Sequence, residues 1–114
     1  MRRLTLPSAT VQDFGSTGVS LKPLARADEP TDGHAVDLVS YAARSRIGRH
    51  PTPFWQLLAV VSGEGWVAGP DGHAFPIGPG EAVLWEPGEE HASGSSGGMV
   101  VVLVQSPLPP VPLD

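Results

Sequence analysis

Glycine and proline interrupt this chain at short, regular intervals, and this spacing limits its fold more than any other feature. The chain has 14 glycines and 13 prolines among 114 residues, about twice the usual share. Proline ends helices and glycine permits tight turns, so this composition favours many short strands. Turn signals recur roughly every 8–12 residues, and no segment has a convincing helical period. The sequence therefore predicts an all-β fold, an antiparallel β-barrel or jelly roll.

Alternating or continuous apolar runs define the expected strands. They are Val19–Leu24, Ala35–Ala43, Phe54–Ser62, Trp66–Ala68, Ala74–Ile77, Glu81–Glu86 and Met99–Gln105. The runs that begin at Phe54 and Met99 are apolar on both faces, as is typical of central strands. We expect turns at Ile47–Gly48 and after most strands, and loops over Ala27–Gly33 and Ala92–Gly98.

The length of the chain indicates one domain, residues 1–114. Residues 1–33 are weakly patterned and are expected to form a peripheral N-terminal segment of one or two strands. Residues 34–106 form the predicted barrel. Residues 107–114 form a proline-rich tail that cannot join a central sheet. Its PLPPVP run favours an extended polyproline conformation or a free end.

Charge and cysteine content exclude several classes of partner. The net charge of -5 repels phosphate, so we expect no nucleic-acid partner. The apolar runs are too short to span a bilayer, and none follows Arg2 and Arg3 as a signal peptide would require. Without cysteine, disulfides and thiolate metal sites are excluded. We therefore expect a cytoplasmic protein with no membrane partner.

One stretch carries histidine at the end of a predicted strand. If a strand runs from His50, then Thr52, Phe54, Gln56 and Leu58 share its face. An imidazole and a carboxamide would then stand above an apolar floor, which is the usual layout of a small-molecule pocket.

These residues resemble the two sequence motifs of the cupin superfamily. In the first motif, His50 matches the first histidine, Thr52 takes the place of the second, and Gln56 takes the place of glutamate, with the glycine at Gly63. In the second motif Gly80, Gly88 and His91 match, whereas Glu86 replaces proline and Ser95 replaces asparagine. The resemblance covers residues 48–105 and implies a small single-domain cupin with a degenerate metal motif.

The resemblance implies a site for a divalent metal (zinc, nickel, copper, iron or manganese) held by His50, Gln56 and His91. Gln56 and Thr52 are neutral where a cation prefers an anionic ligand, so this set suits late first-row metals best. Glu89 shares the face of His91 by parity and could supply a carboxylate. The alternative is that His50 and His91 form hydrogen bonds across the pocket mouth without metal.

The three tryptophans, Trp55, Trp66 and Trp85, either pack the barrel or line the pocket and stack on a ring-shaped ligand. Trp55 has the opposite parity to Gln56 and should point away from the pocket, against a partner subunit or the N-terminal strand. Strands that are apolar on both faces need more cover than this chain supplies, which favours a homodimer.

Three functions remain open from the sequence. The first is a cupin that binds or senses a small molecule, with or without a metal, in a pocket lined by His50, Gln56, His91, Thr52, Phe54 and Leu58. The second is a metal-dependent cupin enzyme of the dioxygenase or isomerase type. The third is a non-catalytic, dimeric structural or interaction module. No catalytic residue can be named, and neither the ligand nor the pathway follows from the sequence.

Overall fold

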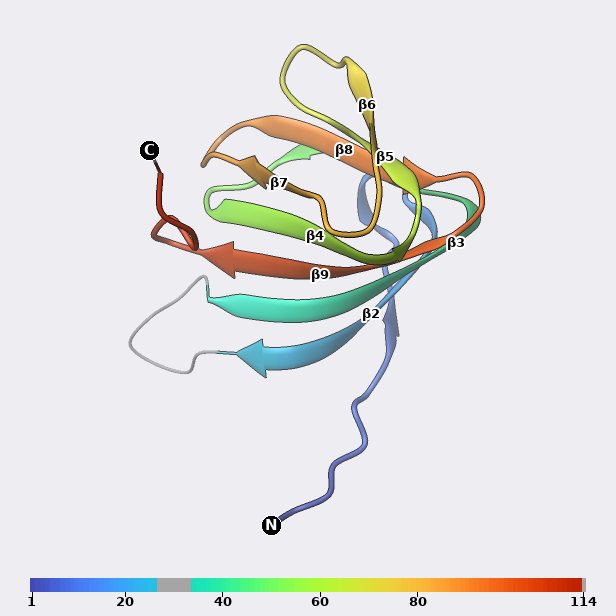
Figure 1. Ribbon diagram of the computed structural model, residues 1–114, viewed down its shortest axis with the longest axis vertical. Coiled ribbons are helices and arrows are strands. Elements are labelled where there is room, and N and C mark those ends of the chain that lie inside the picture. The colour runs from blue at the N-terminus through green and yellow to red at the C-terminus, as the bar shows by residue number, and fades with distance from the viewer. Residues whose placement is uncertain (27–33, 114) are drawn as a thin grey trace.

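The computed structural model describes residues 1–26 and 34–113 and shows an antiparallel barrel that is nearly closed (Figure 1). Its elements are β1 (Ala9–Thr10), the short 3-10 turn η1 (Asp13–Gly15), β2 (Thr17–Arg26), β3 (Ala35–Pro51), β4 (Trp55–Gly63), β5 (Gly65–Ala68), β6 (Ala74–Ile77), β7 (Ala82–Trp85), β8 (Glu90–Ser95) and β9 (Met99–Ser106). The predicted all-β class and barrel are confirmed.

The strands follow the order β6-β5-β8-β3-β9-β4-β7, with β2 also paired to β3 and β1 paired to β2. All of these pairs are antiparallel. In Figure 1, β2, β3, β9 and β4 lie side by side in one layer, and β5 and β8 lie across from them. The space between the two layers holds the core and the cavity described below.

Strand β3 is longer than the sequence predicts and connects the two layers. Residues 35–41 pair with β9, and residues 45–51 pair with β8. Between these parts Arg44 has a φ of 58°, and the register shifts again between Ile47 and His50. The turn expected at Ile47–Gly48 is therefore wrong, because a bend and a bulge redirect the strand without ending it.

The segment Ala92–Gly98, expected to be a flexible loop, is also different. Strand β8 continues to Ser95, and Ser93, Gly94 and Ser95 are buried. Small residues are needed here because a side chain on Gly94 would lie 2.6 Å from Cζ2 of Trp66. The serines and the glycine, which were expected to form a loop, therefore lie in a closely packed strand. The other expected loop, Ala27–Gly33, lies outside the described residues.

The core lies between the layers and comes from nearly every strand. Its buried members are Val19, Val39, Tyr41, Leu58, Val60, Val67, Ile77, Trp85, Met99 and Val101. Burial alternates along β4, where Gln56, Leu58 and Val60 are buried, Trp55, Leu57 and Ala59 are half-buried, and Val61 is exposed. The inner face predicted for this strand is therefore the face that meets the core.

Candidate functional site

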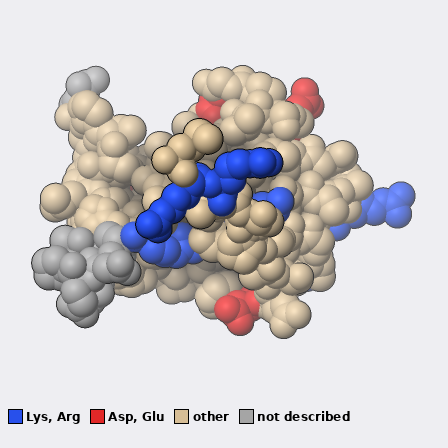
Figure 2. Space-filling view, turned by 90° about the horizontal axis from the view of Figure 1, so that it is seen from below, with Lys and Arg blue, Asp and Glu red and all other residues tan. Residues whose placement is uncertain are grey.

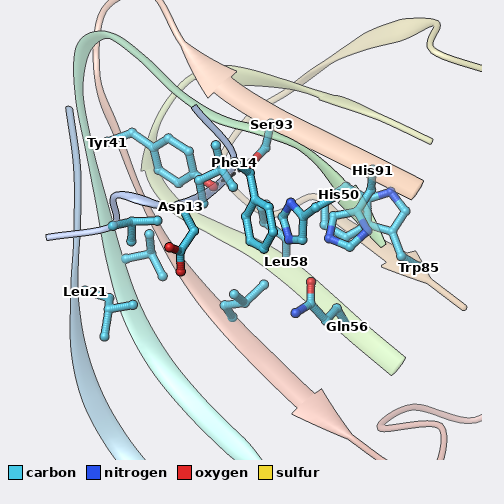
Figure 3. A pocket seen from close by; sticks show the side chains of 14 residues that line it. Asp13, Phe14, Leu21, Tyr41, His50, Gln56, Leu58, Trp85, His91 and Ser93 are labelled. Atoms are coloured by element: carbon cyan, nitrogen blue, oxygen red, sulfur yellow. Dashed lines mark hydrogen bonds between the residues drawn. The ribbon is translucent and has the colours of Figure 1, made fainter. Parts of the chain in front are cut away.

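A cavity of about 140 Å³ lies inside one end of the barrel. Its apolar wall includes Leu21, Val39, Leu58 and Leu103, which come from four different strands. His50, Gln56 and His91 lie near one another in the lining of the cavity (Figure 3). An apolar cavity with a few convergent polar groups is the usual form of a ligand site.

Strand pairing brings the two histidines together. His50 near the end of β3 is directly opposite His91 on β8, and the ring centroids are 4.6 Å apart. The pairing arises because β3 bends after residue 44 and takes β8 as its partner. The sequence alone had placed these histidines in two separate motifs, 41 positions apart.

Each histidine is oriented by a backbone carbonyl two residues before it. Nδ1 of His50 lies 2.7 Å from the Gly48 carbonyl oxygen, and Nδ1 of His91 lies 3.1 Å from that of Glu89. A carbonyl only accepts, so both Nδ1 atoms carry the proton in the neutral rings. Both Nε2 atoms therefore keep their lone pairs free, the arrangement in which histidine binds a metal or accepts a proton.

The histidine rings are also packed between two aromatic side chains. Phe14 stacks on His50 with centroids 4.1 Å apart and planes 5° apart, and Trp85 stacks on His91 at 4.4 Å and 19°. Figure 3 shows the four rings in a row. The stack limits how far either imidazole can rotate, so the site is organised before any ligand arrives.

Burial also holds His91 in its neutral form. The ring is 3% exposed, and desolvation is the main cause that lowers its pKa below the ordinary value. The neighbouring His50 and Arg49 lower the pKa further, whereas the hydrogen bond to Glu89 opposes the shift. His91 is therefore a neutral acceptor at physiological pH.

Gln56 presents its oxygen to the histidines. Its Nε2 donates to Oε1 of Gln105 at 3.1 Å, and the carboxamide oxygen faces the two imidazoles (Figure 3). The pairing of Gln56 with both Trp85 and Gln105 in the sheet fixes this position. The glutamate position of the cupin motif is thus occupied by a neutral acceptor.

A pair of hydroxyl groups lies farther along the cavity wall. The hydroxyls of Tyr41 and Ser93 are 2.7 Å apart and buried. Burial raises the pKa of Tyr41 to about 12, although the bond to Ser93 opposes this change. The phenol therefore stays protonated over the physiological range. Alternation in the strand from Ala35 could have placed Tyr41 inside, beside Val39, whereas nothing indicated Ser93 as its partner.

Residues 11–16, which we call the strap, close one side of the cavity, although no sequence pattern predicted a role for them. Asp13 and Phe14 line the cavity, and Phe14 is 56% exposed, so it lies at the mouth. The strap is attached to β3: the Gly48 amide donates to Oγ of Ser16 at 3.1 Å, and Nε of Arg46 donates to the Gly15 carbonyl at 3.2 Å. No motif signals these contacts, because they join distant segments.

The remaining residues expected in the pocket have different positions. Leu58 lines the cavity, whereas Thr52 and Phe54 are not among its lining residues. Strand β3 ends at Pro51 and β4 begins at Trp55, so the alternation assumed from His50 onward is interrupted. Oγ1 of Thr52 instead accepts the Phe54 amide at 3.4 Å.

The side chain of Glu89 does not lie where we expected it, on the same face as His91. Its carboxylate accepts the backbone N–H of Glu86 at 2.6 Å and stabilises the turn before β8. The two histidines do not bond through their Nδ1 atoms either, since each of these is used by a carbonyl. Of the tryptophans, Trp85 lines the cavity, while Trp55 and Trp66 do not.

The donor set determines which metal could fit. His50, His91 and Gln56 line the same cavity and each keeps a neutral acceptor atom, but among residues 1–26 and 34–113 no cluster of three or more His, Cys, Asp or Glu could hold a metal ion. Two imidazoles and a neutral oxygen fit a late first-row divalent ion bound with modest affinity. They do not fit ions that prefer several carboxylates.

This barrel, with its cavity and histidine pair at one end, defines the protein as a small cupin domain. A family model described as the AraC-like ligand binding domain matches residues 34–103, and the chain belongs to this family. In the described part of the chain, no helix is long and apolar enough to cross a membrane.

The chain is similar to (R)-mandelonitrile lyase from Granulicella tundricola, with 31% identity over 84 residues. That match covers 74% of this chain and 63% of the lyase, less than two thirds of its length.

Two solved structures show the same fold. The polyketide cyclase RemF from Streptomyces resistomycificus superposes with a TM-score of 0.79 at 19% identity. The superposition covers 97% of this chain and 82% of the RemF chain. A cupin-like protein from Thermotoga maritima superposes with a TM-score of 0.80 at 22% identity. This superposition covers 95% of this chain and 83% of the Thermotoga chain. At these identities the likeness concerns the fold alone.

Proposed function

We propose that this protein binds a small molecule in the cavity bounded by His50, Gln56, His91 and Leu58. The observation that carries this proposal is the cavity itself, in which apolar walls meet three oriented acceptors. The imidazoles are held by carbonyls and aromatic rings, so a ligand would meet a site that needs little reorganisation. Membership of a ligand-binding family supports this function.

The binding function is tested with a panel of neutral, acidic and basic one-ring compounds. Binding of each compound is monitored through the NMR chemical shifts of the backbone amides. We expect at least one compound to shift residues around the cavity. Leu58→Phe should fill the cavity and abolish the shifts, whereas Val61→Phe, on an exposed position of the same strand, should preserve them. Circular dichroism would check that both variants fold. If no compound in the panel binds, the proposal is wrong.

The second candidate function is a metal-dependent enzyme. It is favoured by the two free Nε2 atoms, since His50, His91 and Gln56 would hold a divalent ion, which would supply Lewis-acid activation of a bound substrate. The relative named as a mandelonitrile lyase makes cleavage of an aromatic cyanohydrin the first reaction to assay.

Metal content separates the two functions. It is measured on protein purified without a histidine tag, together with His50→Ala and His91→Ala. Near-stoichiometric metal that both variants lose, together with metal-dependent turnover, would favour the enzyme. Protein without metal, and without thermal stabilisation by zinc, nickel, copper, manganese or iron(II), would rule the enzyme out and leave a metal-free binding site.

A homodimer is part of the proposed function. The outer face of strands β3, β9, β4 and β7 carries a group of apolar pairs: Leu38 pairs with Val102, and Leu57 pairs with both Val104 and Leu84, all of them half-buried. A contiguous apolar sheet face of this kind marks an interaction site. A second copy is the occupant we propose, because two identical apolar faces cover each other in a closed pair. The cytoplasmic location stays a prediction.

A further inference from the structure

The charges around the cavity are unequal. Among residues 1–26 and 34–113, no Lys or Arg lines the cavity, whereas Asp13 of the strap contributes a carboxylate. All seven Lys and Arg side chains are exposed instead. Figure 2 shows such side chains gathered in a band over one outer face. An anionic ligand in the cavity would therefore find no cation to compensate its charge.

The polar atoms around the histidine pair are mainly hydrogen-bond acceptors. Both Nδ1 atoms are used by the Gly48 and Glu89 carbonyls, so His50 and His91 each present an Nε2 lone pair. Gln56 uses its amide nitrogen on Gln105 and presents its oxygen. A ligand that desolvates these acceptors must bring a donor, because a buried acceptor without a partner costs free energy.

The cavity also limits the size of the ligand. Its volume of about 140 Å³ is close to the ~150 Å³ of an engineered apolar cavity that binds benzene. Leu58 and Leu103 supply apolar surface to the same cavity that the histidines line. One ring therefore fits, and the aromatic stack from Phe14 to Trp85 limits room for a second.

We infer that the ligand is an uncharged one-ring molecule that carries a hydroxyl or N–H donor, and that the site discriminates against carboxylates of the same size. The ring lies on the wall formed by Leu58 and Leu103, and the donor points to Nε2 of His50 or His91. This inference rests on the proposed binding function and specifies its ligand class.

Three probes of nearly equal size test the inference: benzyl alcohol, toluene and benzoate. Affinity is measured by NMR titration on protein that has been treated with a chelator, so that no metal can attract the carboxylate. We expect benzyl alcohol to bind best. Toluene, which lacks the donor, should bind roughly three- to ten-fold more weakly, and benzoate more weakly than toluene.

Asp13 provides a charge test at an exposed residue of the cavity lining. Its side chain is exposed, so Asp13→Lys should fold. We expect this variant to bind benzoate roughly five-fold more tightly than the wild type, and any change in toluene affinity to be smaller than the change for benzoate, because toluene carries no charge. Glu64→Lys, which makes the same change in net charge at an exposed site away from the cavity, should leave all three affinities unchanged.

Two results would overturn the inference. Benzoate binding as tightly as benzyl alcohol to the metal-free wild type would refute the ligand class, while the proposed binding function would stand. Failure of all three probes to bind, when other compounds of the panel do bind, would also refute this class. Failure of the whole panel would refute the binding function with it.

Discussion

At the scale of single residues, Tyr41 is the clearest reporter of the interior of the barrel. It is the only tyrosine of the chain, and burial raises its pKa to about 12. The ordinary value of 10.0 applies to the unfolded chain. Between these pH values the unfolded chain loses a proton that the folded protein keeps. Folding stability should therefore be intact below pH 10 and fall as the pH rises through this interval.

The prediction for Tyr41 is a delayed ionisation. The tyrosinate absorbance of the folded protein should appear near pH 12, and stability should drop by about 2–3 kcal/mol across the interval. In Tyr41→Phe this part of the pH dependence should disappear. An absorbance rise centred near pH 10 in protein that is still folded would contradict the burial of the phenol.

Gln56 determines how well the site binds a cation. Gln56→Glu would place a carboxylate before the two Nε2 atoms, and we expect zinc affinity to rise by roughly ten-fold or more. Calorimetric titration with zinc measures this change. Gln105→Glu is the matched control, because it alters the same hydrogen-bonded pair at a residue that does not line the cavity. Equal effects of both variants would argue against a metal site at Gln56.

At the scale of elements, the strap depends on the glycine of β3 beneath it. A side chain at Gly48 would overlap the Phe14 carbonyl, and Phe14 itself has a φ of 60°, which costs about 1–2 kcal/mol. Contacts with Gly48, Arg46 and His50 must offset this strain. The strap and β3 therefore stabilise each other.

We expect Gly48→Ala to displace the strap and lower stability by about 1–3 kcal/mol. Chemical denaturation measures the loss, and NMR shifts should locate the change at Phe14 and His50. Gly97→Ala is the control, since nothing lies within 4 Å of the added methyl group, and it should cost under about 0.5 kcal/mol. Equal stability of the two variants would show that the strap does not contact β3 closely.

At the scale of the whole molecule, charged substitutions can test whether the proposed dimer forms through one particular face or through any exposed apolar residue. Val102→Glu and Leu57→Glu place a charge on the outer face of strands β9 and β4, and we expect a monomer at micromolar concentration because a buried unpaired charge is costly. Phe75→Glu changes an apolar residue of β6 that is 55% exposed and should remain dimeric. Light scattering after size exclusion reports the mass, and a monomeric wild type would refute the dimer.

The sequence determined the fold class and four of the residues that line the cavity. Glycine and proline set the turns, and apolar alternation set the strands, because both signals act over a few neighbouring residues. The motif resemblance selected His50 and His91, and strand parity placed Gln56 and Leu58 on the inner face. These four residues line the cavity together.

Only the tertiary structure decided how the site is completed. Strand β3 bends without ending, β8 pairs with it through buried small residues, and the strap brings Asp13 and Phe14 to the cavity. Each of these results depends on contacts between residues far apart in the chain, such as the Gly48 amide with Ser16. Local propensity cannot encode such contacts, since they form only when the closing of the barrel brings the segments together.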